Sequence, residues 1–530
     1  MSTIHYNGIC IPENYHFGYD AEQGGVTTAP YLLPPSKGGY APETICVDIG
    51  RQLFVDDFLI EKSDGLQRIF YAAQKAPDPV LVPETEWELT YNPSTACTSG
   101  GIWYDESEQI YKMWYEAGFN NRLAYATSKD GIHWERPVLQ PTGNNLLIPE
   151  QCTDSFSVWI DHNAPVDERY RLMIRSPNTK ECCKFPAIMY RSGDGIHWQV
   201  IGETGTMEDR STFFYDPFRK KWVFSIRSAA VVRWGEEQYR PRLRLYHDGD
   251  KFEQAGKWEE EEPLLWLRAD GLDRKDLSVS NEIPQLYNFD AIAYESVMLG
   301  MFQIWYGPHN DEIVKTGKPK ITDLQVSFSR DGFYFDRPNR QAFIGASRDY
   351  GRWDYGYLQS ATGGIVVYDN QLRIYYSGFS GQCRQGERSW RGEYVGGAVG
   401  YATLRRDGFA SMSGSGVLET KPLTVQKPIR YLFVNADASA GSLRAELLDR
   451  DGKPLQGYTA EDCVPVMENS TKLRLQWRGG EDVALLQNQP FRIRFLIDHD
   501  HLFAFWLSPG EDGASGGAMA AGYAGKMKMQ

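Results

Sequence analysis

Residues 128–134 read SKDGIHW and residues 192–198 read SGDGIHW, so one Ser-x-Asp-Gly-Ile-His-Trp pattern occurs twice. In this pattern Gly tolerates a positive φ and Asp accepts hydrogen bonds from nearby backbone amides, which predicts a tight turn. The aromatic residue that follows is expected to pack between neighbouring structural units. We therefore interpret His133 and His197 as turn residues and not as catalysts.

Degenerate copies of the pattern, an Asp-Gly turn followed by an aromatic residue, recur along the chain. Successive aspartates are 64, 54, 83 and 76 residues apart, and each interval is long enough for a four-stranded sheet with its loops. A short strand rich in aromatic and β-branched residues precedes each copy. The five aspartates are Asp130, Asp194, Asp248, Asp331 and Asp407.

Five all-β units in series, with little helical periodicity, predict an all-β chain: a five-bladed β-propeller followed by a C-terminal β-sandwich. The repeat ends after Thr403, and the short strands from about Val417 onward are typical of a sandwich. The Ser- and Gly-rich stretch 411–416 is interpreted as the linker between the domains. The predicted organisation is an N-terminal extension over 1–45, the propeller over 46–412, the sandwich over 413–508 and a disordered Gly- and Ala-rich tail over 509–530.

The composition limits the classes of ligand. A net charge of -14 on 530 residues, without a basic run, argues against a nucleic-acid partner and favours a neutral substrate. The 13% aromatic content suits strands and sugar-binding surfaces. The chain has no leader pattern and no apolar run of membrane-spanning length, which predicts a cytoplasmic protein that does not bind membranes.

No cofactor and no bound metal are expected. The eight cysteines lack metal-type or redox spacing, and dinucleotide, phosphate-loop and zinc patterns are absent from the sequence. The acidity of the predicted funnel leaves a structural cation open, without a nameable ligand set. The oligomeric state also stays open.

Candidate catalytic residues follow from the propeller itself, because the starts of its innermost strands converge in one central funnel. Asp154 and Asp209 each lie seven positions before an aspartate of a hairpin turn, so both are expected to face this funnel. Paired carboxylates among aromatic side chains suit the cleavage of glycosidic bonds. The funnel candidates are Asp154, Asp209, Asp290 and Asp354, with Glu88 and Asn92 in the first unit.

Two further residues are candidates for substrate binding. Arg210 follows Asp209 directly, where a guanidinium either lowers the pKa of that aspartate or binds sugar hydroxyls or phosphate. Tyr287 lies three positions before Asp290 in the same expected strand.

The run over 79–137, which contains YNPSTACTSGGIWYDESEQIYKMWYEAG, resembles the first blade of the five-bladed propeller glycosidases of the invertase, levansucrase and arabinanase group (families 32, 68 and 43) and of the related mannoside phosphorylases (family 130). Asn92-Pro93-Ser94 is similar to the phosphorylases' Asn-Pro-Gly stretch. Glu208-Asp209-Arg210 is similar to the Glu-Asp-Pro or Arg-Asp-Pro motif that carries a functional Asp in these families.

The sequence departs from the family pattern at three places. The invertase-type Asn-Asp-Pro-Asn is absent, with Asp56 and Asp57 as its nearest substitutes, and no Pro follows Asp209. The distal Glu-Cys-Pro has no clear copy, which leaves Glu282 and Glu295 as candidates for the general acid.

The resemblance implies a glycoside hydrolase acting on small oligosaccharides or glycosides of the fructofuranoside or arabinofuranoside kind. It makes Asp154 the base or nucleophile, Asp209 the transition-state stabiliser or pKa modulator, and Asp290 or Glu295 the proton donor. Two alternatives stay open: a glycoside phosphorylase on the same fold, and a non-catalytic carbohydrate-binding propeller.

Overall fold

The computed structural model describes residues 3–12, 28–90, 92–162, 164–178, 183–234, 237–381 and 394–525. It confirms the predicted all-β class, because strands make up nearly all of the regular structure. The α-helices of the described chain are short: α1 (Glu86–Leu89), α2 (Phe252–Ala255) and α3 (Asn310–Thr316). In these described ranges no helix is both long and apolar enough to cross a membrane.

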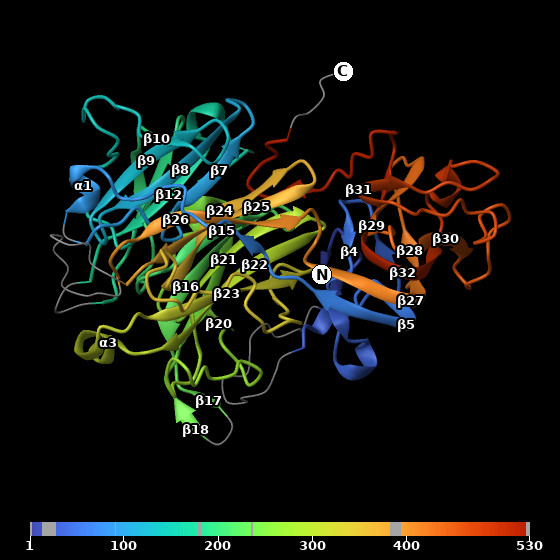
Figure 1. The fold of residues 1–530 in the computed structure, drawn as a ribbon, viewed down its shortest axis with the longest axis horizontal. Helices are drawn as coiled ribbons and strands as arrows, with labels where there is room; N and C mark the ends of the chain where they lie inside the picture. The colour runs from blue at the N-terminus through green and yellow to red at the C-terminus, as the bar shows by residue number, and fades with distance from the viewer. Residues whose placement is uncertain are drawn as a thin grey trace.

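Most of the chain forms antiparallel sheets in which consecutive strands pair (Figure 1). The second sheet consists of β11 (Ser155–Ile160), β12 (Tyr170–Arg175), β13 (Ile188–Ser192) and β14 (Gln199–Glu203). The third consists of β15 (Thr212–Asp216), β16 (Lys221–Ala229), β19 (Arg242–Gly249) and β20 (Leu264–Leu267). The fourth consists of β21 (Gln285–Glu295), β22 (Val297–Gly307), β23 (Ile321–Ser329) and β33 (Ala518–Met519).

Two further groups of four strands, the first and the fifth of the ring, share one eight-stranded sheet. A parallel pairing of Ile102 with Gly363 joins these two groups. The first group contains β7 (Gly101–Asp105), β8 (Ile110–Ala117), β9 (Arg122–Ser128) and β10 (Trp134–Glu135). The last contains β24 (Gly356–Tyr368), β25 (Gln371–Phe379), β26 (Ala398–Arg405) and β6 (Gln74–Lys75). Strand β6 precedes the first group in sequence, yet Lys75 pairs with Ala402 of the last, so the chain closes on itself.

The leading strands of the five groups contact one another in a closed cycle. Strand β7 contacts β11, β11 contacts β15, β15 contacts β21, β21 contacts β24, and β24 contacts β7. Every residue of β11 and β21 is buried, as expected for strands at the centre of such a ring. The starts of these strands therefore meet at one end of the ring.

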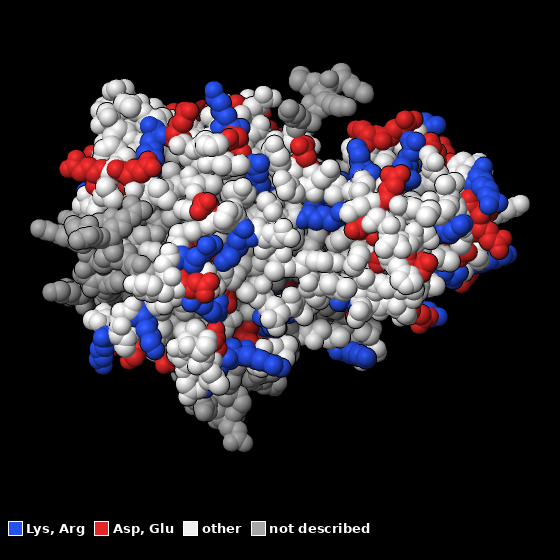
Figure 2. Space-filling model, in the orientation of Figure 1, with Lys and Arg blue, Asp and Glu red and all other residues white. Residues whose placement is uncertain are grey.

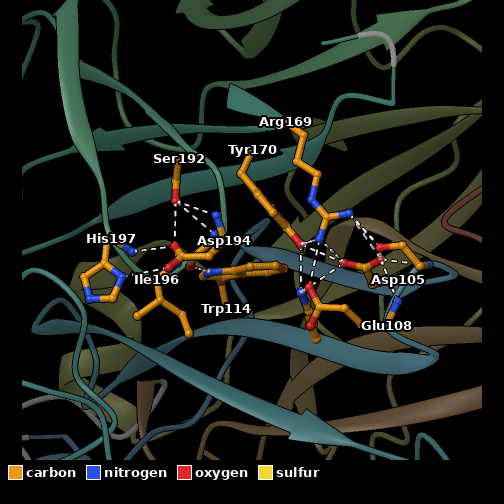
Figure 3. Close-up of polar contacts among 12 residues, drawn as sticks. Asp105, Glu108, Trp114, Arg169, Tyr170, Ser192, Asp194, Ile196 and His197 are labelled. Atoms are coloured by element: carbon orange, nitrogen blue, oxygen red, sulfur yellow. Dashed lines mark hydrogen bonds and ion pairs between the residues drawn. The ribbon is translucent and has the colours of Figure 1, made fainter. Parts of the chain in front are cut away.

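The repeated turns join neighbouring sheets, as Figure 3 shows for the second copy. Asp194 Oδ1 accepts hydrogen bonds from the amides of Ile196 and His197, each at 2.8 Å, and Gly195 has a φ of +78°. The indole of Trp114, in β8, donates to the carbonyl of Gly195 at 2.7 Å and thereby connects the first sheet to the second. The imidazole of His197 is 72% exposed, consistent with a turn residue.

A nine-stranded sheet forms the second part of the molecule, seen at the right of Figure 1. It contains strands from both ends of the chain, so the expected boundaries at 46 and 413 do not describe it. The stretch 411–416, expected to be a linker, lies inside β27, where Gly and Ser accommodate a bulge in the pairing with β5 and β32. The strands are β3 (Ile45–Cys46), β4 (Gln52–Leu53), β5 (Ile60–Phe70), β27 (Ala410–Thr420), β28 (Leu423–Thr424), β29 (Tyr431–Asp437), β30 (Ser442–Asp449), β31 (Asn469–Arg474) and β32 (Phe491–Ser508).

Residues 509–525 of the Gly- and Ala-rich segment form backbone pairs with the ring, and the prediction that they are disordered was wrong. Strand β33 pairs with the end of β21, and Ala520 forms a bridge with Val366 of β24. The amide of Tyr104, in β7, donates to the carbonyl of Ala521 at 2.8 Å. Small residues fit here because the segment runs close against three strand groups.

Two minor hairpins, β1 (Thr3–Ile4) with β2 (Cys10–Ile11) and β17 (Val232–Trp234) with β18 (Glu237–Tyr239), complete the described strands.

Candidate functional site

Polar side chains gather at the end of the ring where the leading strands begin. Because the sheets are antiparallel meanders, the second strands end there and the third strands begin there. Asp154 directly precedes β11, and Asp209 and Arg210 precede β15. Glu116 lies at the end of β8, and Tyr287 lies near the start of β21. This end of the ring is the candidate site.

Asp154 is a buried, ion-paired carboxylate. It is 5% exposed, and its Oδ2 accepts a hydrogen bond from Nη1 of Arg175 at 3.1 Å. Nη2 of Arg210 lies 3.6 Å from Oδ1 of Asp154. Two guanidinium groups thus face one carboxylate.

Arg210 combines a strained backbone with unused donors. Its φ is +61°, an unusual value for a residue other than glycine, and its amide donates to Ser155 Oγ at 2.7 Å. The side chain is 3% exposed, yet its Nε and Nη1 have no hydrogen-bond partner. Its guanidinium carbon lies 5.6 Å from the ring centroid of Phe119. A ligand group placed here would satisfy these donors.

Glu116 belongs to the site but was not among the sequence candidates. It is completely buried, its Oε1 accepts the amide hydrogen of Asn120, and its Oε2 has no partner. Burial raises the pKa of Glu116 to about 8; the positive charge of Arg210 opposes this shift and the negative charge of Asp154 adds to it. Glu116 is therefore protonated at neutral pH, beside an ion-paired carboxylate.

Asp209 lies at the more exposed side of the site. Both Asp209 and Glu208 form ion pairs with Nη1 of Arg227, which comes from the end of β16. The side chains of Glu208, Asp209 and Arg227 are 20, 19 and 16% exposed, so solvent reaches the site from this side.

Tyr287 lies among cations. Burial alone would raise the pKa of its phenol, but the charges of Lys320, Arg242, Arg210 and Arg227 lower it to about 7. Nζ of Lys320 donates to the Tyr287 hydroxyl at 3.3 Å. The charges around this phenol therefore stabilise a negative oxygen.

Aromatic rings form a wall beside these charges. Phe119 and Tyr394 stack with ring centroids 4.1 Å apart, and Tyr357 meets Tyr287 edge-on at 5.5 Å. They belong to a separate aromatic cluster, distinct from the main hydrophobic core. Flat aromatic faces of this kind suit the apolar face of a sugar ring.

Asp290 lies deeper in the ring and ties sheets together. Its carboxylate accepts hydrogen bonds from Ser360, from Ser99 at 3.3 Å, from Asn288 at 3.2 Å and from Thr362 at 3.4 Å. Burial raises its pKa to about 6, and the bond from Ser360 and the charge of Arg244 limit the rise. Because donors from three strand groups already surround Asp290, its oxygens are less available to a substrate than those of Glu116.

The structure does not bring Glu295 to the site. Glu295 ends β21, so it lies at the hairpin at the opposite end of that strand from Tyr287. It is completely buried, accepts a hydrogen bond from Arg406 at 2.9 Å and from Ser515 Oγ at 2.7 Å, and lies 3.5 Å from Nε of Arg51. These partners connect the ring to the nine-stranded sheet and to the C-terminal segment, which makes Glu295 a structural carboxylate.

Glu88, another sequence candidate, holds a loop in place. Glu88 caps α1 by accepting the amides of Glu84 and Thr85 at 2.9 and 3.0 Å, and it also accepts Nε of Arg136 at 2.8 Å. Burial opposes the ionisation of Glu88, but the bond from Arg136 and the two amides leave its pKa below the usual range.

Asp354 and Asn92 have different surroundings. Asp354 pairs with Lys75 at 2.7 Å and accepts the Tyr376 hydroxyl at 3.2 Å, so it fixes the closing strand β6. Asn92 is buried with its Oδ1 unpartnered, and its carbonyl accepts the amide of Phe119 at 2.9 Å. Asn92 therefore stays a candidate beside the aromatic wall.

The funnel candidates were found as polar residues at the starts of leading strands. Glu116 lies at the end of a second strand, β8, so this criterion did not find it. The usable signal was a glutamate inside the otherwise aromatic and buried stretch YKMWYEA. Among the described residues, no group of three or more His, Cys, Asp or Glu side chains is arranged to hold a metal ion.

No protein-family model and no curated protein matches the chain. Solved structures with a similar arrangement include an N-acetylgalactosamine deacetylase from F. plautii (12% identity, TM-score 0.44, covering 63% of this chain and 96% of the other). They also include a glycosyl hydrolase from Bacteroides ovatus (13% identity, TM-score 0.41, 64% and 94%) and an exo-β-1,3-galactanase from Phanerochaete chrysosporium (9% identity, TM-score 0.33, 80% and 99%).

Proposed function

We propose that this protein is a glycoside hydrolase built on a five-bladed β-propeller with an appended β-sandwich. The closed cycle of β7, β11, β15, β21 and β24 supports five blades, each led by one of these strands. The nine-stranded arrangement around β27 and β32 supports the sandwich. The active site then lies where the leading strands begin, the end of the ring at which the charged side chains collect.

One observation carries the proposed activity: Arg210 acts on two carboxyl groups, because its charge opposes the raised pKa of Glu116 and its Nη2 lies 3.6 Å from Oδ1 of Asp154. Cleavage of a glycosidic bond requires two carboxyl groups, one that donates a proton and one that acts as base or nucleophile. Glu116 protonates the leaving oxygen, and Asp154 activates water or attacks the anomeric carbon. We propose Glu116 as the proton donor in preference to Asp290 or Glu295.

The remaining candidates have supporting roles in this proposal. Asp209 stabilises the transition state from the exposed side, and Asp290 maintains the geometry from below. Tyr287, Arg210 and Asn92 contact the substrate, and the rings of Phe119 and Tyr394 carry the sugar. We retain small oligosaccharides or glycosides of the furanoside kind as the substrate class.

A glycoside phosphorylase is the second candidate. The observation that favours it is the buried guanidinium of Arg210 with two unpartnered nitrogen atoms, because guanidinium groups bind phosphate well. In that case phosphate takes the place of the attacking water, and the product is a sugar 1-phosphate.

The two candidates are separated by one assay. The purified full chain is incubated with a panel of aryl furanosides and pyranosides, with and without phosphate. Release of the aryl group without phosphate supports the hydrolase, and release only with phosphate supports the phosphorylase. If no glycoside of the panel is cleaved while sugars still bind, the protein is a carbohydrate-binding propeller and the proposal is wrong.

A further inference from the structure

Cationic side chains are concentrated around Tyr287, next to the proposed acid and base. We call this group the cation cluster; it consists of Arg210, Arg227, Arg242, Arg244 and Lys320. Such a concentration is unexpected in a chain with a net charge of -14. On the face shown in Figure 2, acidic and basic side chains are interspersed and no comparable basic patch is visible.

Carboxylates neutralise only part of the cation cluster. Arg227 pairs with Glu208 and Asp209, and Arg210 shares Asp154 with Arg175.

Arg242 and Arg244, by contrast, have neutral partners. Arg242 donates to Gln285 Oε1 at 2.8 Å, and Arg244 donates to the carbonyls of Arg210 and Tyr287. Over the described part of the chain, neither of these two arginines forms an ion pair with a carboxylate.

The cation cluster contains donors without hydrogen-bond partners. Nε and Nη1 of Arg210 are buried without a partner, and so are Nε of Arg242 and Nε of Arg244. The guanidinium of Arg242 lies 5.1 Å from the ring centroids of both Tyr287 and Trp305. Buried guanidinium nitrogens without acceptors are costly, and the cost is removed when an anion binds to them.

The lowered pKa of Tyr287 agrees with this surplus of positive charge. A buried phenol normally ionises less readily, yet here the surrounding cations outweigh burial. The cluster therefore presents a positive potential to any group that enters it.

The geometry points to a binding site for an acidic sugar, in which Arg210 and Arg242 hold a carboxylate on the sugar ring while the ring rests on Phe119 and Tyr394. A planar guanidinium matches a carboxylate in two-point contact, and stacked aromatic rings supply a face for the sugar. This inference rests on the proposed function and narrows its substrate class, small oligosaccharides or glycosides, to those that carry an acidic sugar. Inorganic phosphate presents the same chemistry to the arginines and is the other source to be tested.

The test is a titration calorimetry series with the full chain and matched probes. The probes are glucuronate, galacturonate and mannuronate, the methyl ester of each, and inorganic phosphate. At least one acid is expected to bind about tenfold or more tightly than its own ester, the effect of losing one charge-assisted hydrogen bond. Arg242→Gln should abolish this preference. Arg430→Gln, which changes an arginine 60% exposed on the other sheet, should preserve it.

The outcomes separate the possibilities. Equal affinity for each acid and ester, or no binding by any acid, overturns the inference. Binding of phosphate alone, without an acidic sugar, also overturns it and assigns the cluster to phosphate.

The proposed function is judged separately, by cleavage. An acid-over-ester preference without cleavage of any glycoside would leave the binding site standing and remove the hydrolase. Cleavage of neutral glycosides without such a preference would do the reverse.

Discussion

The guanidinium of Arg210 lies 3.6 Å from the carboxylate of Asp154, although the two residues precede the leading strands of different sheets. Glu116, from a third sheet, completes the group. Three consecutive strand groups thus bring Arg210 together with Glu116, whose pKa is raised, and with the ion-paired Asp154. This arrangement underlies the predictions that follow.

Activity is expected to fall at alkaline pH, because the proton donor must be protonated. The pKa of Glu116 is raised to about 8 by burial, so kcat/KM should decrease as the pH rises through about 8. In Glu116→Gln this alkaline limb should disappear, and turnover should drop by about 10²- to 10⁴-fold. A pH profile of kcat/KM for both proteins measures this; an unchanged limb in the variant would assign it to another group.

The raised pKa of Glu116 also predicts how the free energy of unfolding depends on pH. Glu116 keeps its proton in the folded chain up to about pH 8, whereas in the unfolded chain it releases the proton near its ordinary pKa. The folded state therefore binds more protons in between, and the free energy of unfolding should fall as the pH rises through this window. Urea unfolding at pH 5 and pH 8 should show a smaller decrease for Glu116→Gln than for the wild type.

Asp209→Asn should reduce turnover by about 10²- to 10⁴-fold while leaving the melting temperature nearly unchanged. Folding is spared because Glu208 still pairs with Arg227, at 3.0 Å, and the site is partly exposed here. Asp64→Asn, which also removes one partner of an ion pair but lies far more exposed, is the matched control with ordinary activity. Ordinary turnover in Asp209→Asn would remove this aspartate from the site.

Glu295→Gln should show the opposite pattern. Glu295 is completely buried between Arg51 and Arg406, and disrupting such a pair costs about 3 kcal/mol of stability. Turnover per folded molecule should be retained, because Glu295 lies at the far end of β21 from the site. Chemical unfolding and kcat together check this; a loss of kcat with unchanged stability would return Glu295 to the catalytic group.

The repeated turn can be tested by a glycine pair. A Cβ at Gly195 would lie 2.6 Å from the Trp114 ring at a φ of +78°, so Gly195→Ala combines a steric clash with backbone strain. Gly143 has a φ of +70° with nothing within 4 Å, so Gly143→Ala carries the strain alone, about 1–2 kcal/mol. Gly195→Ala should cost about 1–3 kcal/mol more. Equal unfolding free energies for the two variants would contradict the role of this turn in joining sheets.

Much of the architecture could be predicted because its signals are local. The Asp-Gly turns need residues that tolerate a positive φ, and the strands before them are rich in aromatic and β-branched residues, which indicates sheets. The register of Gly- and Ser-rich strands is not local information: β27 reads as a linker until its pairing with β5 and β32 is known. The C-terminal segment likewise looks disordered in sequence because its small residues are explained only by the strands it contacts.

The site was only partly predictable for the same reason. Asp154, Asp209 and Arg210 could be anticipated from their places before leading strands. Glu116 was missed because it lies at the end of a second strand, and Glu295 was proposed from the family resemblance although it ends the leading strand β21. The three-dimensional arrangement shows that the charge of Arg210 acts on Glu116, whereas Glu295 forms ion pairs with Arg51 and Arg406.

The most direct test of the central claim compares substrates that differ in their leaving groups. A dinitrophenyl glycoside leaves without a proton, whereas a phenyl glycoside of the same sugar depends on the general acid. We predict that Glu116→Gln loses about 10²-fold or more with the phenyl glycoside but less than about tenfold with the dinitrophenyl glycoside, and that Asp154→Asn loses activity on both. Wild-type rates for both variants on both substrates would contradict the assignment of Glu116 and Asp154 as acid and base.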